Sequence, residues 1–383
     1  MSFTGNKGEW SELYVLVKLL MEGKLHQSDF DLNKDENNIY EIVKAYKIES
    51  DYTLEFDRKN VIDIYKTNNT GVKIKIGIIS IDDLKSISEK LFSGIKKGVG
   101  KSFSINEVTD FLAKNQIQKL KAPSHIKSDI RLKIYDHRLA TETDLGFSIK
   151  SLLGGDSTLF NTGKGNNFIF SVKVSMEESI ANFNRRTYKP PNNIAKLTYR
   201  LKELEELGAK LKFETTQSKK LWRNLKMVDG DLPEILGWAQ YYRWYNRDSS
   251  LSGVSEQLEL NDPLNFYEGQ PSEQRLYEYK LKRFLTESAM GMTSETPWLG
   301  EYDSFGGVII AKNDGDIVCF HVYDFNLFRN YLLKNTMFEQ PSTGEDENNP
   351  GTEKSTGKKY YYGWLYEENN ELFIKMNLQI RFK

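Results

Sequence analysis

The sequence KSDIRLKIYD (residues 127–136) is followed, after a short polar segment, by LGFSIKS (residues 145–151). In both stretches apolar side chains alternate with polar ones, which is the pattern of a half-buried β-strand. The residues between them, 137–144, are mostly polar and suit an exposed turn. The two stretches therefore predict a β-hairpin with one apolar and one polar face.

Three polar side chains are predicted to share one face at the open end of this hairpin. If the strands pair symmetrically about residues 139 and 140, Asp129 lies opposite Lys150, with Cβ atoms ~5 Å apart. Ser148 precedes Lys150 by two residues and points to the same side. A hard cation takes oxygen ligands, and a lysine beside it can orient or deprotonate an attacking water, so this face suits metal-dependent phosphodiester hydrolysis. A plain surface ion pair between Asp129 and Lys150 is the alternative.

Further segments extend the pattern along the whole chain. They are NKGEWSEL (residues 6–13), KSDI (127–130), LGFSIKS (145–151) with the following LGGDSTL (153–159), and NLQIRF (377–382). In this order they resemble the HpaII family of type II restriction endonucleases, which belongs to the PD-(D/E)xK nuclease superfamily. The resemblance implies an α/β (α+β) fold: a restriction-endonuclease-like core with a mixed central sheet flanked by helices, plus additional α+β elements that recognise DNA.

The resemblance also implies a chemistry for the hairpin. Asp129 takes the place of the first acidic metal ligand, and Lys150 that of the catalytic lysine. The chain departs from the superfamily pattern at Ser148, where most members carry Asp or Glu. We expect Ser148 to be a spectator or a water-mediated ligand, so one acidic ligand must come from elsewhere.

The first predicted helix, residues 9–21, offers that carboxylate. Glu9 and Glu12 are three residues apart and share a helix face, and many PD-(D/E)xK folds supply an extra acid from their first helix. We list Glu12 with Asp129 as a metal ligand, but the choice between Glu9 and Glu12 stays open. The alternative is that both acids merely complement the helix dipole.

Two regions suggest contacts with DNA. Residues 154–167 are rich in glycine and in hydrogen-bond donors, although Gly165 after Lys164 excludes a Walker A motif. Segment 185–226 carries twelve Lys and Arg against four Glu, an excess that favours a polyanion-binding face. A structural loop and an ordinary solvated surface are the alternatives. The residues predicted to bind DNA are Ser151, Asp156, Ser157, Thr158, Asn161, Lys164, Arg185, Arg186 and Lys358.

The chain divides by pattern into three parts. Residues 1–180 are expected to form the nuclease core, with the first helix and the catalytic hairpin (127–151). Residues 181–300 are expected to form a basic helical region that contacts DNA, and residues 301–383 a β-rich C-terminal segment that packs on the core. Within the last part, residues 341–357 are predicted to be a flexible loop. Near the C-terminus, Asn377, Gln379 and Arg381 share one face of the last predicted strand, and they either read base edges or belong to a buried polar network.

Composition sets broad limits on the class of protein. A chain of 383 residues with 39% hydrophobic residues can bury a large core and divide into subdomains. The net charge of -1 does not exclude a local basic face. Cys319 is the single cysteine, which excludes internal disulfides and predicts a reducing, cytoplasmic setting. The sequence contains no apolar run of ~18 residues, so we expect no helix that spans a membrane.

The resemblance, together with the polar face of the hairpin, implies a type II restriction endonuclease, a Mg²⁺-dependent hydrolase of double-stranded DNA at a short sequence. The resemblance implies CCGG as the first candidate target and a cognate DNA cytosine methyltransferase as the functional partner, and it is compatible with a homodimer. Two alternatives are a DNA-binding protein whose nuclease core has decayed at Ser148, and a DNA repair nuclease without sequence specificity.

Overall fold

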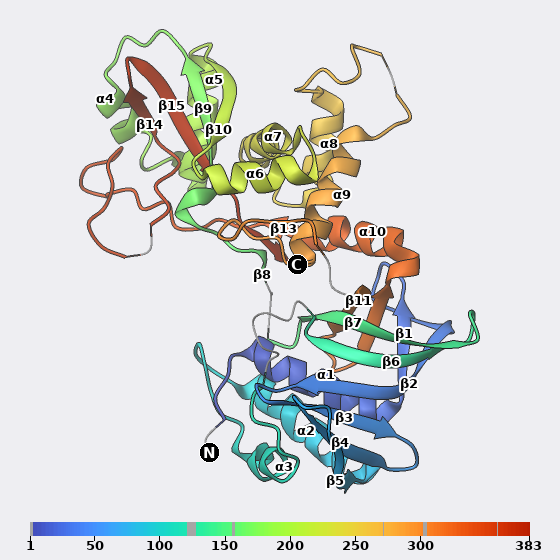
Figure 1. Ribbon diagram of the computed structural model, residues 1–383. Coiled ribbons are helices and arrows are strands. Elements are labelled where there is room, and N and C mark those ends of the chain that lie inside the picture. Colours follow the sequence, from blue (N-terminus) through green and yellow to red (C-terminus); the bar gives the residue numbers. More distant parts are fainter. Residues whose placement is uncertain (1–2, 121–127, 155–157, 271, 302–304, 358) are drawn as a thin grey trace. The chain divides into compact units, whose positions relative to one another are not determined.

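The computed structural model describes residues 3–120, 128–154, 158–270, 272–301, 305–357 and 359–383. Their contacts divide the chain into two compact units. Unit 1 comprises Met1–Ser157 and Tyr302–Phe328, and unit 2 comprises Thr158–Glu301 and Arg329–Lys383 (Figure 1). These limits differ from the segments predicted from sequence, because residues 158–180 belong to unit 2 and residues 305–328 to unit 1.

Unit 1 contains a mixed nine-stranded sheet in the order β1-β12-β11-β7-β6-β2-β3-β4-β5. This agrees with the predicted mixed central sheet accompanied by helices. The helices are α1 (Lys7–Glu22), α2 (Ile81–Lys97) and α3 (Thr109–Lys114). The strands are β1 (Lys24–Ser28), β2 (Lys34–Ile48), β3 (Tyr52–Arg58), β4 (Ile62–Asn68), β5 (Lys73–Ile79), β6 (Ile130–Asp136), β7 (Thr141–Ser151), β11 (Phe305–Ala311) and β12 (Ile317–His321).

The long strand β2 closes part of this sheet into a ring. Its first half pairs with β1, and residues 40–46 pair with β6. Strands β11 and β12 form a hairpin of residues 305–321 that lies between β7 and β1 in the sheet. This late hairpin therefore connects two strands of the N-terminal part of the chain. The side chains of residues 308–311 in β11 are fully buried, which makes this late hairpin part of the core.

Helix α1 begins and ends where its sequence dictates. Asn6 and Glu9 form a reciprocal capping box at its start, and Gly23 closes it in a left-handed conformation that glycine adopts without steric cost. Its buried face includes Trp10, Leu13 and Leu20, and the helix packs against α2, β2 and β7 (Figure 1). The first helix is therefore held against the strand that carries Lys150.

The predicted hairpin is present, but its predicted register is wrong by two residues. Ile130 pairs with Phe147 and Asp136 with Thr141, so the same register places Asp129 opposite Ser148 rather than Lys150. The reason is a tight turn at residues 137–140, where Asp136 accepts a hydrogen bond from the Leu139 N–H at 3.2 Å. A shift of two residues leaves every side chain on its predicted face, because side chains alternate with a period of two.

Unit 2 contains a four-stranded antiparallel sheet, β10-β9-β15-β14, and a three-stranded sheet, β13-β16-β8. Its strands are β8 (Thr158–Phe160), β9 (Asn167–Lys173), β10 (Lys210–Thr216), β13 (Thr336–Phe338), β14 (Leu365–Glu368), β15 (Glu371–Asn377) and β16 (Ile380–Phe382). Its helices are α4 (Ile180–Arg186), α5 (Lys196–Glu206), α6 (Lys219–Val228), α7 (Leu232–Tyr245), α8 (Leu251–Asn261) and α9 (Leu276–Ala289), and α10 (Phe325–Asn335) contains the boundary between the units.

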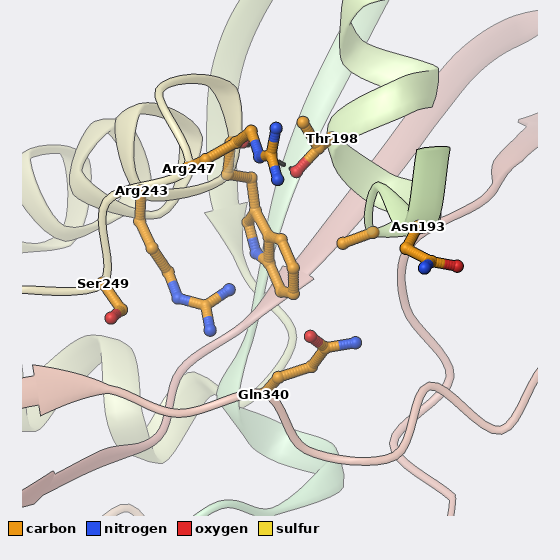
Figure 2. A pocket seen from close by; sticks show the side chains of 8 residues that line it. Asn193, Thr198, Arg243, Arg247, Ser249 and Gln340 are labelled. Carbon is orange, nitrogen blue, oxygen red and sulfur yellow. Dashed lines mark hydrogen bonds between the residues drawn. The ribbon is translucent and has the colours of Figure 1, made fainter. Parts of the chain in front are cut away.

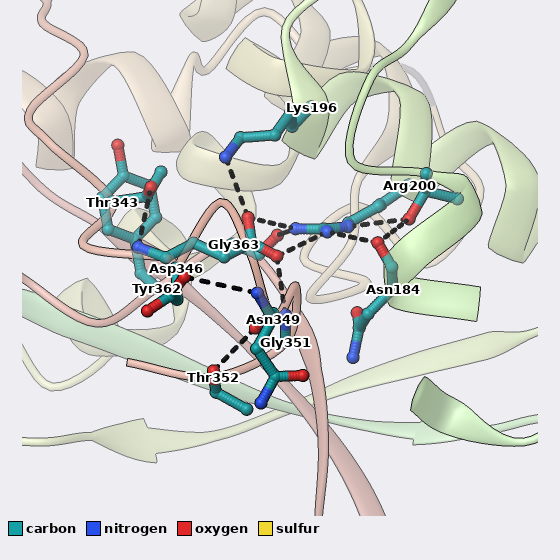
Figure 3. A network of polar contacts seen from close by, with 12 residues as sticks. Asn184, Lys196, Arg200, Thr343, Asp346, Asn349, Gly351, Thr352, Tyr362 and Gly363 are labelled. Carbon is teal, nitrogen blue, oxygen red and sulfur yellow. Dashed lines mark hydrogen bonds and ion pairs between the residues drawn. The ribbon is translucent and has the colours of Figure 1, made fainter. Parts of the chain in front are cut away.

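Two polar features stand out inside unit 2. A pocket lies where the start of α5, the end of α7 and the residue Gln340 after β13 meet (Figure 2). Beside α5, the buried Arg200 and Glu345 form an ion pair that holds the long connection between β13 and β14 (Figure 3). Residues 341–357, predicted to be a flexible loop, are thus linked to the helical part of unit 2 by a buried ion pair that the sequence pattern did not predict.

Nowhere in the described ranges is there a helix long and apolar enough to cross a membrane.

Candidate active site

Asp129, immediately before β6, is fastened to the neighbouring strand. Its Oδ2 accepts a hydrogen bond from the Ile149 N–H at 2.6 Å, and its own N–H donates to the Phe147 carbonyl at 3.0 Å. The side chain is half-buried. Burial raises the pKa of the carboxyl, while the Ile149 N–H and the nearby Lys150 act to lower it. The carboxylate therefore has a set position next to Lys150.

Lys150 lies near the end of β7 with two carboxylates around it. Burial lowers the pKa of its ammonium, and Asp129 and Glu12 act in the opposite direction. Ser148, two residues earlier, is buried and pairs with Val308 of β11. The hairpin thus brings Asp129, Ser148 and Lys150 together on one face, as the sequence predicted.

Glu9 and Glu12 have different surroundings on α1. Glu9 belongs to the capping box, where Oε2 accepts the Asn6 N–H at 2.9 Å. Burial lowers the pKa of both Lys150 and Lys47, and Glu12 is close enough to each to oppose that lowering. A hydrogen bond of 2.8 Å from Ser151 Oγ to Ser11 Oγ joins α1 to the end of β7. Glu12, rather than Glu9, therefore shares the electrostatic environment of the hairpin site.

Sequence reasoning missed two charged residues beside this site. Lys47 is buried in β2 and donates from Nζ to the Leu120 carbonyl at 3.1 Å. Glu49 is buried just after β2 and accepts the Gln118 N–H at 3.1 Å. Burial lowers the pKa of Lys47 and raises that of Glu49. Their spacing of two along a strand was a signal that they share a face, but nothing in the sequence linked that face to the hairpin.

The available side chains suit a hard divalent cation with few protein ligands. Asp129 and Glu12 supply carboxylate oxygens, and Mg²⁺ is usually bound by one or two carboxylates together with waters and substrate phosphate oxygens. In the part of the chain that the structure describes, no group of three or more His, Cys, Asp or Glu residues is placed to hold a metal ion.

The chain is similar to known proteins over nearly its whole length. A family model described as HpaII restriction endonuclease matches residues 6–382. The type II restriction enzyme HpaII of Haemophilus parainfluenzae is 35% identical over 384 residues, which cover 99% of each chain. The chain belongs to the HpaII restriction endonuclease family. It is accordingly a type II restriction endonuclease, a hydrolase that cleaves DNA at specific sites. No solved structure matches the chain.

The residues that we predicted to contact DNA in this family member are distributed over both units. Ser151 is in unit 1, where it bonds to Ser11 and accepts the Leu153 N–H at 3.2 Å. Asp156, Ser157 and Lys358 lie outside the described residues. The others are exposed in unit 2, namely Thr158 at the start of β8, Asn161, Lys164, and Arg185 and Arg186 at the end of α4.

Several charges of the basic segment are partnered inside unit 2. Arg186 bonds to Glu178 and Glu203, while Arg200 and Lys196 both pair with Glu345. The excess of positive charge in this segment therefore overstates the basic surface that it presents to solvent.

The alternative left open for Asn377 has an answer in the structure. The side chain is 1% exposed and donates to Asn167 Oδ1 and to the Gly163 carbonyl at 2.7 and 2.9 Å. Asn377 is a member of a buried polar network and does not present its amide to solvent.

Proposed function

We propose that this enzyme cuts double-stranded DNA at a short sequence with Mg²⁺, and that unit 1 is its PD-(D/E)xK nuclease core. The observation that supports this most directly is the shared environment of Glu12, Asp129 and Lys150, which come from α1, the start of β6 and β7. Exposed basic side chains of unit 2 contact the DNA backbone in this proposal.

Each residue of the site has a distinct role. Asp129 and Glu12 hold the cation, and the Ile149 N–H orients the Asp129 carboxylate. When bound, Mg²⁺ supplies stabilisation of the charge that develops on the phosphate and activation of a water molecule. Lys150 orients the attacking water, and because burial lowers the pKa of its ammonium it exchanges a proton more readily than an exposed lysine. Ser148 is a spectator or a water-mediated ligand.

The target and partner follow from the family resemblance. We propose CCGG as the recognition sequence, with cleavage blocked by methylation of its cytosines. A cognate DNA cytosine methyltransferase that protects the host genome is then the functional partner.

Cleavage of unmethylated phage DNA with Mg²⁺ tests this proposal. The wild type should give sharp fragments whose ends contain the target, whereas Asp129→Asn and Lys150→Ala should give none. Lys133→Ala is the matched control, because Lys133 lies on the same face of the hairpin but pairs with Glu142 at 2.5 Å, and it should cut like the wild type.

Other outcomes identify the alternatives. A smear of fragments would indicate a nuclease without sequence specificity. Intact DNA with every divalent metal would indicate a DNA-binding protein with a decayed core. Equal cutting by the wild type, Asp129→Asn and Lys150→Ala would show that the active site lies elsewhere.

A further inference from the structure

The pocket at the end of α7 has a polar lining without a carboxylate. Its volume is about 240 Å³. Figure 2 shows the side chains of Arg243, Arg247, Ser249 and Gln340 around it. The full lining is Asn193, Ala195, Thr198, Arg243, Trp244, Arg247, Ser249 and Gln340.

Arg243 is a buried cation that has no acidic partner within ion-pair distance among the described residues. Its side chain is only 7% exposed, and its guanidinium lies 3.7 Å from the centre of the Trp244 ring. Its Nε is buried and has no hydrogen-bond partner. Burial lowers the pKa of Arg243 to about 10, and Glu339 and Tyr362 raise it only in part. A buried charge of this kind is costly unless a partner compensates it.

Arg200 in the same unit shows how the fold satisfies a buried guanidinium when the role is structural. Arg200 is fully buried, pairs with both Glu345 oxygens at 2.6 and 3.0 Å, and donates to the Gly363 and Asn184 carbonyls and to Thr187 Oγ1 (Figure 3). Most buried polar groups are satisfied in this way. Arg243 is the contrasting case, because its Nε has no hydrogen-bond partner and its side chain lines a pocket.

The remaining lining defines the chemistry that would satisfy Arg243. Arg247 adds a second guanidinium. The carboxylate of the neighbouring Asp248 is occupied by Ser250, whose N–H and hydroxyl both donate to Asp248 Oδ1 at 2.8 Å. Asn193, Ser249 and Gln340 add neutral donors. Two guanidiniums in one lining, together with amide and hydroxyl donors, match a phosphate group, which accepts several charge-assisted hydrogen bonds.

We propose that this pocket of unit 2 binds a phosphate group through Arg243 and Arg247, and that the phosphate belongs to the backbone of the DNA substrate. The choice of DNA as the source rests on the endonuclease function, whereas the phosphate chemistry rests on the pocket alone. All of the lining residues belong to unit 2, and none of them is among the residues that we predicted from sequence to bind DNA.

Arg243→Met is the informative variant, since it keeps a long side chain against Trp244 and removes the charge. Binding of a target duplex is measured in EDTA, so that no cleavage occurs, over a range of KCl concentrations. We expect affinity at least about tenfold weaker, and a log–log salt slope smaller by about one, which corresponds to one lost phosphate contact. Arg275→Met is the matched control, because Arg275 pairs with Glu256 and Glu278, and it should bind like the wild type.

Thermal melting distinguishes a ligand site from a structural arginine. Removing an uncompensated buried charge should leave the melting temperature of Arg243→Met unchanged or raise it. Inorganic phosphate, compared with KCl at equal ionic strength, should raise the melting temperature of the wild type more than that of the variant. Arg247→Met, at an exposed position, repeats both measurements without altering the core and should show the same losses.

The combination of DNA-binding and phosphate results distinguishes three cases. Weaker DNA binding with a reduced slope supports the backbone as the source. Phosphate-dependent stabilisation lost in both variants, with unchanged DNA binding, would keep the phosphate site and overturn DNA as its source. Normal DNA binding and normal phosphate response in both variants would overturn the proposal altogether. The wild type would still cut DNA in that case, so the endonuclease function would stand.

Discussion

Glu9 and Glu12 lie three residues apart on α1, and their neighbours assign them different tasks. Glu9 caps the helix through the Asn6 N–H, whereas Glu12 acts on Lys47 and Lys150. Two acids that are equivalent by sequence pattern are thus distinguished by what packs against the helix. We therefore propose Glu12 as the carboxylate that the hairpin lacks.

This difference predicts that two matched substitutions affect the rate of DNA cleavage differently. Glu12→Gln should lower the rate of DNA cleavage at least about 100-fold, because even outer-shell partners of metal ligands cost 10–100-fold. Glu9→Gln should keep cleavage near the wild-type rate and cost at most about 1 kcal/mol of stability through the weakened capping box. Cleavage rates at saturating Mg²⁺ and urea unfolding measure the two effects. A cleavage defect in Glu9→Gln alone would assign the ligand to Glu9.

At the scale of elements, the connection from β13 to β14 depends on one buried carboxylate. Glu345 is held by Arg200 and Lys196, and it also accepts the Gly351 N–H at 3.0 Å (Figure 3). Glu345 therefore links the loop to α5 and also connects two parts of the loop to each other.

Glu345→Ala should lower the free energy of unfolding by roughly 3–5 kcal/mol, because it leaves the buried Arg200 without its partner. Glu256→Ala removes an exposed partner of Arg275 and should cost less than about 1 kcal/mol. Urea unfolding of both variants makes the comparison. Equal losses would mean that the buried pair contributes no more than a surface pair.

The end of β12 makes the stability of unit 1 depend on pH. His321 is 1% exposed and stacks on Tyr40 at 4.8 Å, and its ring Nδ1 accepts the Tyr323 N–H. Burial, helped by the nearby Arg138, lowers the pKa of His321 from 6.5 to about 4, although Asp136 and Asp324 oppose this. The folded protein thus binds this proton less readily than the unfolded chain does.

A lowered folded-state pKa contributes stability that is complete above pH 6.5 and is lost as the pH falls toward about 4. The full loss amounts to roughly 3 kcal/mol, at 1.4 kcal/mol for each pKa unit. We expect the free energy of unfolding to fall between pH 7.5 and 5 more steeply in the wild type than in His321→Gln, whose side chain stays neutral. Parallel pH profiles of the two proteins would contradict this assignment.

At the scale of the whole molecule, each compact unit is assembled from two separate parts of the chain. Unit 1 takes β11 and β12 from residues 305–321, and these strands sit between β7 and β1 in its sheet. The fully buried side chains of β11 have no substitute in the N-terminal part. A fragment that ends at residue 180 therefore lacks strands from the interior of its own sheet.

We predict that residues 1–180 alone do not fold cooperatively, while residues 1–157 joined to 302–328 by a flexible Gly/Ser linker do. Without β11 and β12, the edges of β7 and β1 are unpaired and the apolar face that β11 covers is exposed. We therefore expect the shorter fragment to aggregate. Far-ultraviolet circular dichroism and thermal melting compare the two. A cooperative transition in the 1–180 fragment would show that β11 and β12 are dispensable.

Local pattern was enough to determine several parts of this protein. Alternation identified the hairpin of β6 and β7, and the first predicted helix, residues 9–21, corresponds to α1. The face shared by Asp129, Ser148 and Lys150 was predicted as well, since a period of two survives a change of register. These features depend on neighbours within a few residues, and such interactions are written directly in the sequence.

Only the tertiary structure decided the rest. It set the register of the hairpin and placed Lys47 of β2 close to Glu12, which also acts on Lys150. It also distinguished Arg200, neutralised by Glu345, from Arg243, which faces a pocket without an acid. The physical reason is that the role of a charged side chain depends on its burial and on partners more than a hundred residues away. The packing of the core determines those partners, and no local pattern specifies them.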